Sequence, residues 1–243
     1  RESYFQIRKI AFESNCENVF FIRYEDPDWH VRLRLKLTET SNQQNILEGM
    51  SEIIEPYRNG GIISSVLIDE YKPEFQRYGG VELTSSAESL FDIDSHICAL
   101  GLRILSGSGG GLSKNKAYLA MHINLQLAAT FLSTADSMRD FFKEIAQSFK
   151  DEFELSKGDQ KLINGKFREF KNIISKFYGS AKPEGKFEHD ISELIDQYGQ
   201  LIKPITDKII ASSSGENHIK SLLSSYIHMT NNRIFADDAR AQE

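Results

Sequence analysis

The chain has 243 residues, a formal net charge of −6 at pH 7 and a pI near 5.6, which argues against a broad surface for nucleic acids or anionic membranes. Its 40% hydrophobic and 26% charged residues are typical of a soluble globular protein with a substantial core. No stretch approaches the ~18 apolar residues of a membrane span. The cysteines, Cys16 and Cys98, form no CxxC pair, which excludes a cysteine-based zinc site and indicates a reducing, cytoplasmic location.

The N-terminal part, residues 1–84, is predicted to be rich in strands. An apolar, aromatic run at Val19–Tyr24 and an alternating run at Val31–Leu37 flank the turn-forming residues 25–28. This pattern predicts a β-hairpin. A helical segment at Asn45–Tyr57 follows, and the β-branched run Ile62–Ile68 predicts a further strand.

The C-terminal part, residues 85–243, is predicted to be mostly helical, because its apolar residues recur at three- and four-residue steps. The regularly spaced phenylalanines between 138 and 177 are assigned to the core rather than to a ligand site. The SGSGGG stretch at 106–111 predicts a flexible loop, and it lacks the GK[ST] order of a phosphate-binding loop.

These patterns predict one α+β domain over residues 1–243, in which an antiparallel sheet from the N-terminal part packs against a mostly helical C-terminal part. The chain begins with Arg1 rather than Met. We therefore expect a trimmed chain or a piece of a longer protein.

One face of the predicted strand after the turn is unusually cationic. If alternate side chains point to opposite sides, Val31, Leu33, Leu35 and Leu37 face the core, whereas the opposite face carries His30, Arg32, Arg34 and Lys36. Arginines spaced two residues apart suit bidentate binding of carboxylate or phosphate. A solvated outer face explains the same pattern, so both interpretations remain open.

The stretch Asp69–Gly80 is a second candidate. Pro73 ends regular structure, and Gly79-Gly80 permits a tight backbone turn. In the functional interpretation this loop delivers Arg77 to the same pocket, with Glu74 orienting it. In the structural interpretation the same two residues form a local ion pair on a surface turn.

A third candidate lies near the C-terminus, where His228 falls opposite the apolar stripe of a predicted helix. Its neighbours on that face are small and uncharged: Asn217, Ser221, Ser224, Ser225 and Asn232. Small polar groups around one histidine suit a cavity wall, where the imidazole acts as an acid or base near neutral pH. An exposed histidine near a frayed helix end is the alternative. The other histidines show no ligand spacing, so no metal site is predicted.

Four segments carry a resemblance to a known family: FFIRYEDPDWHVRLRL, YKPEFQRYGG, AESLFDIDS and SSYIHMTNNRIF. In this order and at these separations they resemble the C-terminal elimination domain of class I lanthipeptide dehydratases, which is also found as a separate protein in thiopeptide biosynthesis. The resemblance implies a lyase that removes glutamate from glutamylated Ser or Thr of a ribosomal precursor peptide, leaving dehydroalanine or dehydrobutyrine.

The resemblance also implies partners. The precursor peptide is the substrate, and a tRNA-dependent glutamylation domain or protein supplies the glutamyl group. We expect no metal, no organic cofactor and no direct contact with nucleic acid, and a homodimer is compatible with the sequence.

By the same resemblance, Arg34, Arg77 and His228 are the catalytic candidates. One arginine would hold the glutamate carboxylate, another would stabilise the enolate, and the histidine would transfer a proton. The substrate-binding candidates are His30, Arg32, Glu74, Tyr78, Asn232 and Arg233. Two alternatives remain: a pyridine-forming cyclase of the same fold, and a non-catalytic module that binds the precursor peptide.

Overall fold

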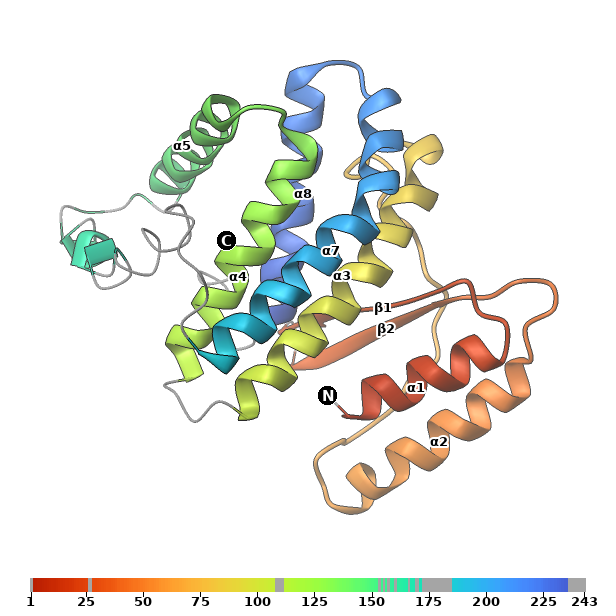
Figure 1. Cartoon of the computed structure of the whole chain (residues 1–243). Coiled ribbons are helices and arrows are strands. Elements are labelled where there is room, and N and C mark those ends of the chain that lie inside the picture. Colours follow the sequence, from red (N-terminus) through yellow and green to blue (C-terminus); the bar gives the residue numbers. More distant parts are fainter. Residues whose placement is uncertain are drawn as a thin grey trace.

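The computed structural model describes residues 2–25, 28–107, 112–152 and 185–235, together with isolated residues between 154 and 171. A helix, a hairpin and a second helix precede a group of longer helices (Figure 1). The elements are α1 (Glu2–Glu13), β1 (Asn18–Tyr24), β2 (His30–Lys36), α2 (Gln43–Asn59), α3 (Val81–Gly107), α4 (Leu112–Phe131), α5 (Ala135–Glu152), α7 (Lys186–Ala211) and α8 (Glu216–Ile234).

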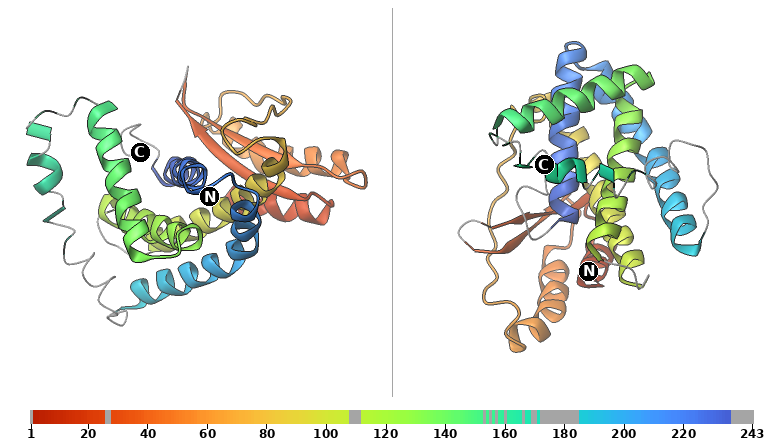
Figure 2. Two further views of the ribbon diagram at one scale, coloured as in Figure 1. Left: turned by 90° about the horizontal axis from the view of Figure 1, so that it is seen from above. Right: turned by 90° about the vertical axis from the view of Figure 1, so that its left-hand side faces the viewer.

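The helices α3, α4, α7 and α8 pack against one another and form the main core. The hairpin lies against one end of this bundle, and α1 and α2 pack together beyond it (Figure 1). Figure 2 shows α8 end-on near the centre of the molecule. A second, smaller core under α1 and α2 contains Ala11, Cys16, Val19 and Ile46.

The predicted hairpin and the α+β class are confirmed. β1 and β2 are antiparallel, with Phe20 opposite Arg34 and Ile22 opposite Arg32. The helices expected at 45–57, 138–153 and 187–205 correspond to α2, α5 and α7. No described helix combines the length and apolar character that crossing a membrane requires.

The strand predicted at Ile62–Ile68 is wrong, because that segment belongs to an extended connection between α2 and α3 with no strand partner among the described residues. β-branched side chains favour an extended backbone, but only a neighbouring strand makes it part of a sheet. The strand-rich character of residues 1–84 is therefore limited to the hairpin. The helix α1 was not predicted.

Three further expectations about burial and loops change. Val31 and Leu37, expected in the core, are 63% and 42% exposed because they lie near the two ends of the strand, although Leu33 and Leu35 pack on the small core as predicted. Within the predicted helix at 162–177, Leu162 and Phe167 are 71% and 54% exposed, and most of that stretch lies outside the described residues. The helix α3 continues through Gly107, and the rest of the predicted loop at 106–111 also lies outside them.

The edge of β1 that faces away from β2 is closed by side chains of α3 and α8. The backbone amide of Val19 donates to Asp92 Oδ1 at 2.9 Å, and that of Phe21 donates to Ser95 Oγ at 3.2 Å. The amide of Arg23 donates to Asn232 Oδ1 at 2.8 Å. The carbonyl oxygen of Phe21 accepts from Arg233 Nε at 3.0 Å, and that of Arg23 accepts from Asn232 Nδ2 at 2.9 Å. An unpaired strand edge exposes backbone groups that need partners. Here side chains supply them, and the hairpin is fixed to the bundle.

A buried ion pair lies next to this edge. Arg233 Nη1 is 2.8 Å from Asp94 Oδ2, and the two side chains are 0% and 3% exposed. The carboxylate also accepts hydrogen bonds from Tyr198 and Thr230. Burial raises the pKa of Asp94, and the Arg233 charge and the hydrogen bonds oppose that increase. The pair and its partners therefore join α3, α7 and α8 at the level of the hairpin.

Candidate active site

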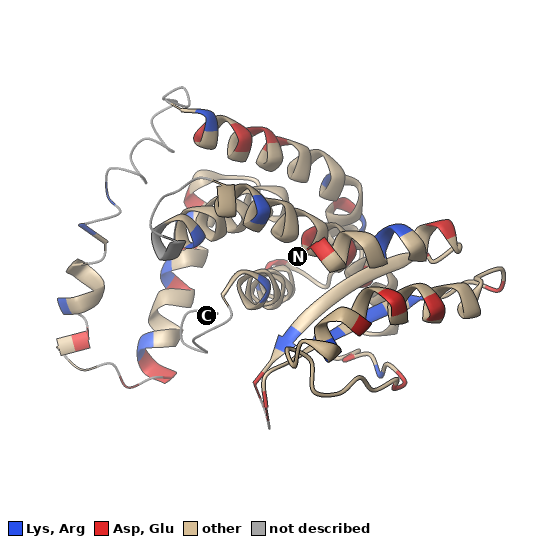
Figure 3. Cartoon of the chain, turned by 90° about the horizontal axis from the view of Figure 1, so that it is seen from below, with Lys and Arg blue, Asp and Glu red and all other residues tan. Residues whose placement is uncertain are grey.

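The cationic face predicted for β2 exists, and its members have different partners. Figure 3 shows Lys and Arg recurring along the hairpin. At one end, Lys36 Nζ is 3.3 Å from Glu17 and 3.8 Å from Glu88, and it donates to Ser85 Oγ. Lys36 is thus neutralised by the scaffold, as the structural interpretation of this face expects.

Arg34, at the middle of the same face, has a different environment. Its guanidinium carbon lies 4.9 Å from the ring centroid of Tyr71. Its Nε is buried and has no hydrogen-bond partner among the residues that the structure describes. An arginine that lies over an aromatic ring keeps its terminal N–H groups available for an anion. The environment of Arg34 therefore favours the anion-binding interpretation.

At the turn end of β2, His30 and Arg32 support each other. Arg32 Nε donates to His30 Nε2 at 3.1 Å, and its guanidinium carbon lies 3.9 Å from the Tyr24 ring centroid. The His30 ring stacks on Tyr24 with its Nδ1 2.7 Å from the Asp28 carbonyl oxygen. Because Nε2 accepts in this arrangement, Nδ1 carries the proton. His30 and Tyr24 thus orient Arg32.

The connection between α2 and α3 brings Arg77 back toward the bundle. Arg77 Nη1 lies 3.3 Å from Glu74 Oε2, so the local ion pair that the sequence allowed is present. Gly79 and Gly80 have φ values of +85° and +89°, and a Cβ on Gly79 would lie 2.6 Å from Leu83 Cδ1. Both glycines are needed for this tight turn into α3.

His228 lies on α8 beside this loop. Burial lowers the pKa of His228, the Arg77 charge lowers it further, and the Glu74 charge acts in the opposite direction. These effects show that the imidazole and the Arg77–Glu74 pair are electrostatic neighbours. No hydrogen bond from the ring to another described residue is present. A neutral imidazole with accessible nitrogen atoms is suited to accept a proton.

Aromatic side chains that contact one another form a floor under two of the predicted catalytic residues, Arg34 and Arg77: Phe20, Tyr71, Tyr78, Phe91 and Tyr226. The guanidinium carbon of Arg34 lies 4.9 Å from the Tyr71 ring centroid, and that of Arg77 lies 5.8 Å from the Tyr78 ring centroid. The negative charge of Glu74 and the positive charge of Arg34 both act on the Tyr71 hydroxyl. The strand, the connection and the last helix thus meet over one floor.

Some predicted binding residues have positioning roles instead. Tyr78 is 5% exposed and packs edge-on against Phe91, so it lies beneath the site. Asn232 and Arg233 are 7% and 0% exposed and bond the edge of β1. Arg233 has no exposed surface in this structure, so its predicted contact with substrate would require the surrounding side chains to move. Tyr24 was missed, and its register opposite His30 becomes evident only once the hairpin is paired.

The chain is a small α+β domain in which a hairpin and a loop carry arginines and the C-terminal helix carries His228 beside Arg77. The family model described as "Lantibiotic biosynthesis dehydratase C-term" matches residues 6–243, and the chain belongs to this family. Within the described residues, no group of three or more His, Cys, Asp or Glu has the arrangement of a metal site.

Two curated proteins are similar to this chain in sequence. The chain is 25% identical over 221 residues to "Subtilin biosynthesis protein SpaB" of Bacillus subtilis, covering 90% of this chain and 20% of that protein. It is 24% identical over 217 residues to "Nisin biosynthesis protein NisB" of Lactococcus lactis subsp. lactis, covering 89% and 20%. The chain thus spans about a fifth of the length of these curated relatives.

A solved structure shares the fold. It is the crystal structure of the tRNA dependent lantibiotic dehydratase MibB from Microbispora sp. 107891, with a TM-score of 0.73 and 17% identity. The similarity covers 97% of this chain and 24% of that one. The α+β architecture is therefore that of one segment of a much longer protein.

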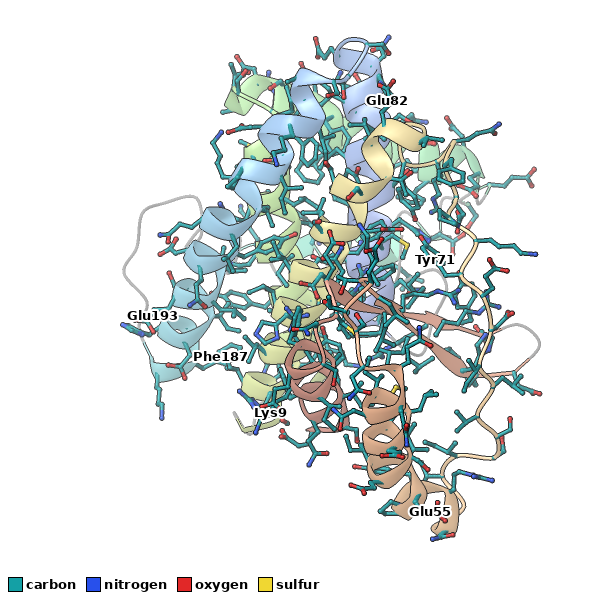
Figure 4. The ribbon with its side chains drawn as sticks, turned by 90° about the vertical axis from the view of Figure 1, so that its right-hand side faces the viewer. Lys9, Glu55, Tyr71, Glu82, Phe187 and Glu193 are labelled. Atoms are coloured by element: carbon teal, nitrogen blue, oxygen red, sulfur yellow. The ribbon has the colours of Figure 1, made fainter. Side chains whose placement is uncertain are left out.

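The two charges next to His228 give a first test of the site geometry. We expect Arg77→Gln to raise the pKa of His228, because the protonated ring is no longer repelled, and Glu74→Gln to lower it. NMR titration of the His228 ring protons measures both changes. Lys9→Gln on α1, on the side of the molecule away from Tyr71 (Figure 4), is the control and should cause no change. Shifts of the same sign in both site variants would contradict this geometry.

Proposed function

We propose that this domain eliminates glutamate from glutamylated Ser or Thr residues of a ribosomally made precursor peptide, leaving dehydroalanine or dehydrobutyrine. The observation that carries the proposal is the arrangement around His228. Its pKa is lowered by burial and by Arg77, and Arg34 lies against Tyr71, a member of the aromatic floor that also carries Arg77. Membership of the dehydratase family supports the same reaction class.

The reaction needs a base and cationic groups. Removal of the Cα proton leaves an electron pair that forms the Cα=Cβ double bond, while the Cβ–O bond breaks and glutamate leaves as a carboxylate. Neutral His228 takes the proton, because its lowered pKa keeps the imidazole unprotonated at neutral pH. Arg77, beside His228, stabilises the enolate.

Arg34 is assigned to the substrate's own carboxylate. The glutamyl group carries a carboxylate that takes no part in bond breaking, and a guanidinium fork binds such a group through paired hydrogen bonds. Arg32, held by His30 and Tyr24, extends the cationic face toward the turn. A tRNA-dependent glutamylation domain or protein would supply the modified peptide, which implies a cytoplasmic site of action.

The direct test uses the purified chain with a chemically glutamylated Ser-containing peptide. We expect free glutamate and a peptide product whose mass is that of the Ser peptide less one water. Ester hydrolysis would instead restore the Ser peptide, so the mass separates the two reactions. An unchanged but tightly bound peptide would contradict elimination and favour a binding module. A pyridine-containing product from a pre-dehydrated peptide would favour the cyclase.

A further inference from the structure

The connection between α2 and α3 is attached to the core by two aromatic side chains, Tyr71 near its middle and Tyr78 near its end. It runs from α2 near Glu55, past Tyr71 beside the hairpin, to α3 near Glu82 (Figure 4). Its described backbone-to-backbone hydrogen bonds lie at its start, where the amides of residues 60–63 donate to the end of α2, and at its end, where Arg77 and Gly80 donate to Glu74 and Phe75. Between these ends Leu67 and Ile68 are 87% and 80% exposed. The position of the loop that carries Arg77 therefore depends on side-chain contacts.

Tyr71 makes the contacts that this exposed stretch lacks. It is partly buried against the main core, and its ring meets Phe20 edge-on, with centroids 6.0 Å apart and planes at 81°. Phe20 lies directly opposite Arg34 in the hairpin register. The ring also lies 4.9 Å from the Arg34 guanidinium carbon. Tyr71 thus joins the loop, the strand floor and the predicted anion-binding arginine.

An aromatic partner and a carboxylate partner affect an arginine differently. A carboxylate fixes the guanidinium but occupies its N–H donors and neutralises its charge, as Glu74 partly does for Arg77. An aromatic face fixes the guanidinium plane and leaves the donors free. Burial raises the pKa of Tyr71 to about 12, so the phenol stays neutral and does not compete with a bound anion.

We propose that Tyr71 is a positioning residue of this site: its ring holds the Arg34 guanidinium so that the N–H donors face the carboxylate of the glutamyl group. The inference rests on the proposed function, because that carboxylate belongs to the proposed substrate. An arginine side chain has many rotamers, and holding one of them in the free protein lowers the entropic cost of binding.

The test is a double-mutant cycle between Tyr71 and Arg34. The probe is a peptide in which diaminopropionate carries glutamate through an amide, so that it resists elimination and its binding can be measured by calorimetry. We expect Tyr71→Leu to weaken binding about tenfold and Tyr71→Phe, which keeps the ring, to change it less than about twofold. In an Arg34→Ala background, Tyr71→Leu should weaken binding of the probe further by less than about twofold, because Tyr71 acts through Arg34.

Phe75→Leu is the matched control, since Phe75 is an aromatic residue of the same connection and is 41% exposed; its binding should equal that of the wild type. If Tyr71→Leu lowers the affinity for the probe equally in the wild-type and Arg34→Ala backgrounds, the proposal is overturned and Tyr71 has a structural role. A lowered unfolding temperature that accounts for the lost affinity would lead to the same conclusion. A Phe variant as weak as the Leu variant would also overturn it. If the wild type binds the probe but does not eliminate glutamate from the glutamylated peptide, the proposed reaction is contradicted. The role of Tyr71 is still tested, because the double-mutant cycle measures binding of the probe.

Discussion

His228→Ala is expected to lower the rate of glutamate elimination about 10²- to 10⁴-fold, the usual contribution of a general base. Binding of the glutamyl peptide should change far less, because the arginines that we propose to bind its carboxylate remain in place. The reason lies in the position of the imidazole, which is partly buried on α8 beside Arg77. Single-turnover measurements with the glutamylated peptide separate the chemical step from binding.

The pH dependence of the wild type adds a second readout. The imidazole accepts a proton only in its neutral form, so the rate should fall as pH drops through the pKa of His228. Because burial and Arg77 lower that pKa, the acid limb should lie below the ordinary histidine value of about 6.5. His189→Ala is the control, since His189 is 61% exposed on α7. That helix's N-terminal end, marked by Phe187 and Glu193, lies across the molecule from Tyr71 (Figure 4). A His228→Ala enzyme with undiminished turnover would exclude the base assignment.

The second large effect concerns stability rather than chemistry. Arg233→Met should lower the free energy of unfolding by about 3–5 kcal/mol, because it leaves the Asp94 carboxylate buried without its counter-charge. Methionine keeps much of the apolar stem, so the loss reports mainly the charge and hydrogen bonds. Both side chains are almost fully inaccessible. Urea unfolding followed by circular dichroism measures the change.

A matched surface pair gives the comparison. Arg139 and Asp136 form an ion pair on α5 at 2.7 Å, but their side chains are 57% and 78% exposed. Arg139→Met should therefore change the free energy of unfolding by less than about 1 kcal/mol. The double variant Asp94→Leu/Arg233→Met should recover part of the loss, because no lone buried charge remains. A single Arg233→Met variant as stable as the Arg139→Met control would show that the buried pair does not stabilise the fold.

The sequence predicted the elements whose patterns are local. Alternation on both sides of a turn predicted the hairpin, and the helical period predicted α5, α7 and α8. The cationic face of β2 was also readable, since it needs only the two-residue period of a strand. The helix α1 was not predicted, because only Ile7 and Ala11 of its side chains are buried and its apolar pattern is weak.

Contacts between residues that are distant in the sequence could not be predicted from it. Asn232 and Arg233 looked like substrate contacts, because polar residues near a candidate base resemble a site. Only the fold shows that they bond Arg23 and Phe21, more than two hundred positions earlier. For the same reason, Lys36 and Arg34 are indistinguishable in the strand pattern. The structure separates them, since Lys36 lies beside Glu17 and Glu88, whereas Arg34 lies beside the ring of Tyr71.

The closed edge of β1 has a consequence for the order in which the protein forms during synthesis. The hairpin leaves the ribosome early, whereas Asn232 and Arg233, which complete its outer edge, are made more than two hundred residues later. Until α8 emerges, the backbone groups of Phe21 and Arg23 lack these partners and remain open to other strands or to water. Such long-range contacts slow folding. The nascent hairpin therefore reaches its final position only when the last helix docks, and the hairpin that carries Arg34 is joined to the helix that carries His228 in that same step.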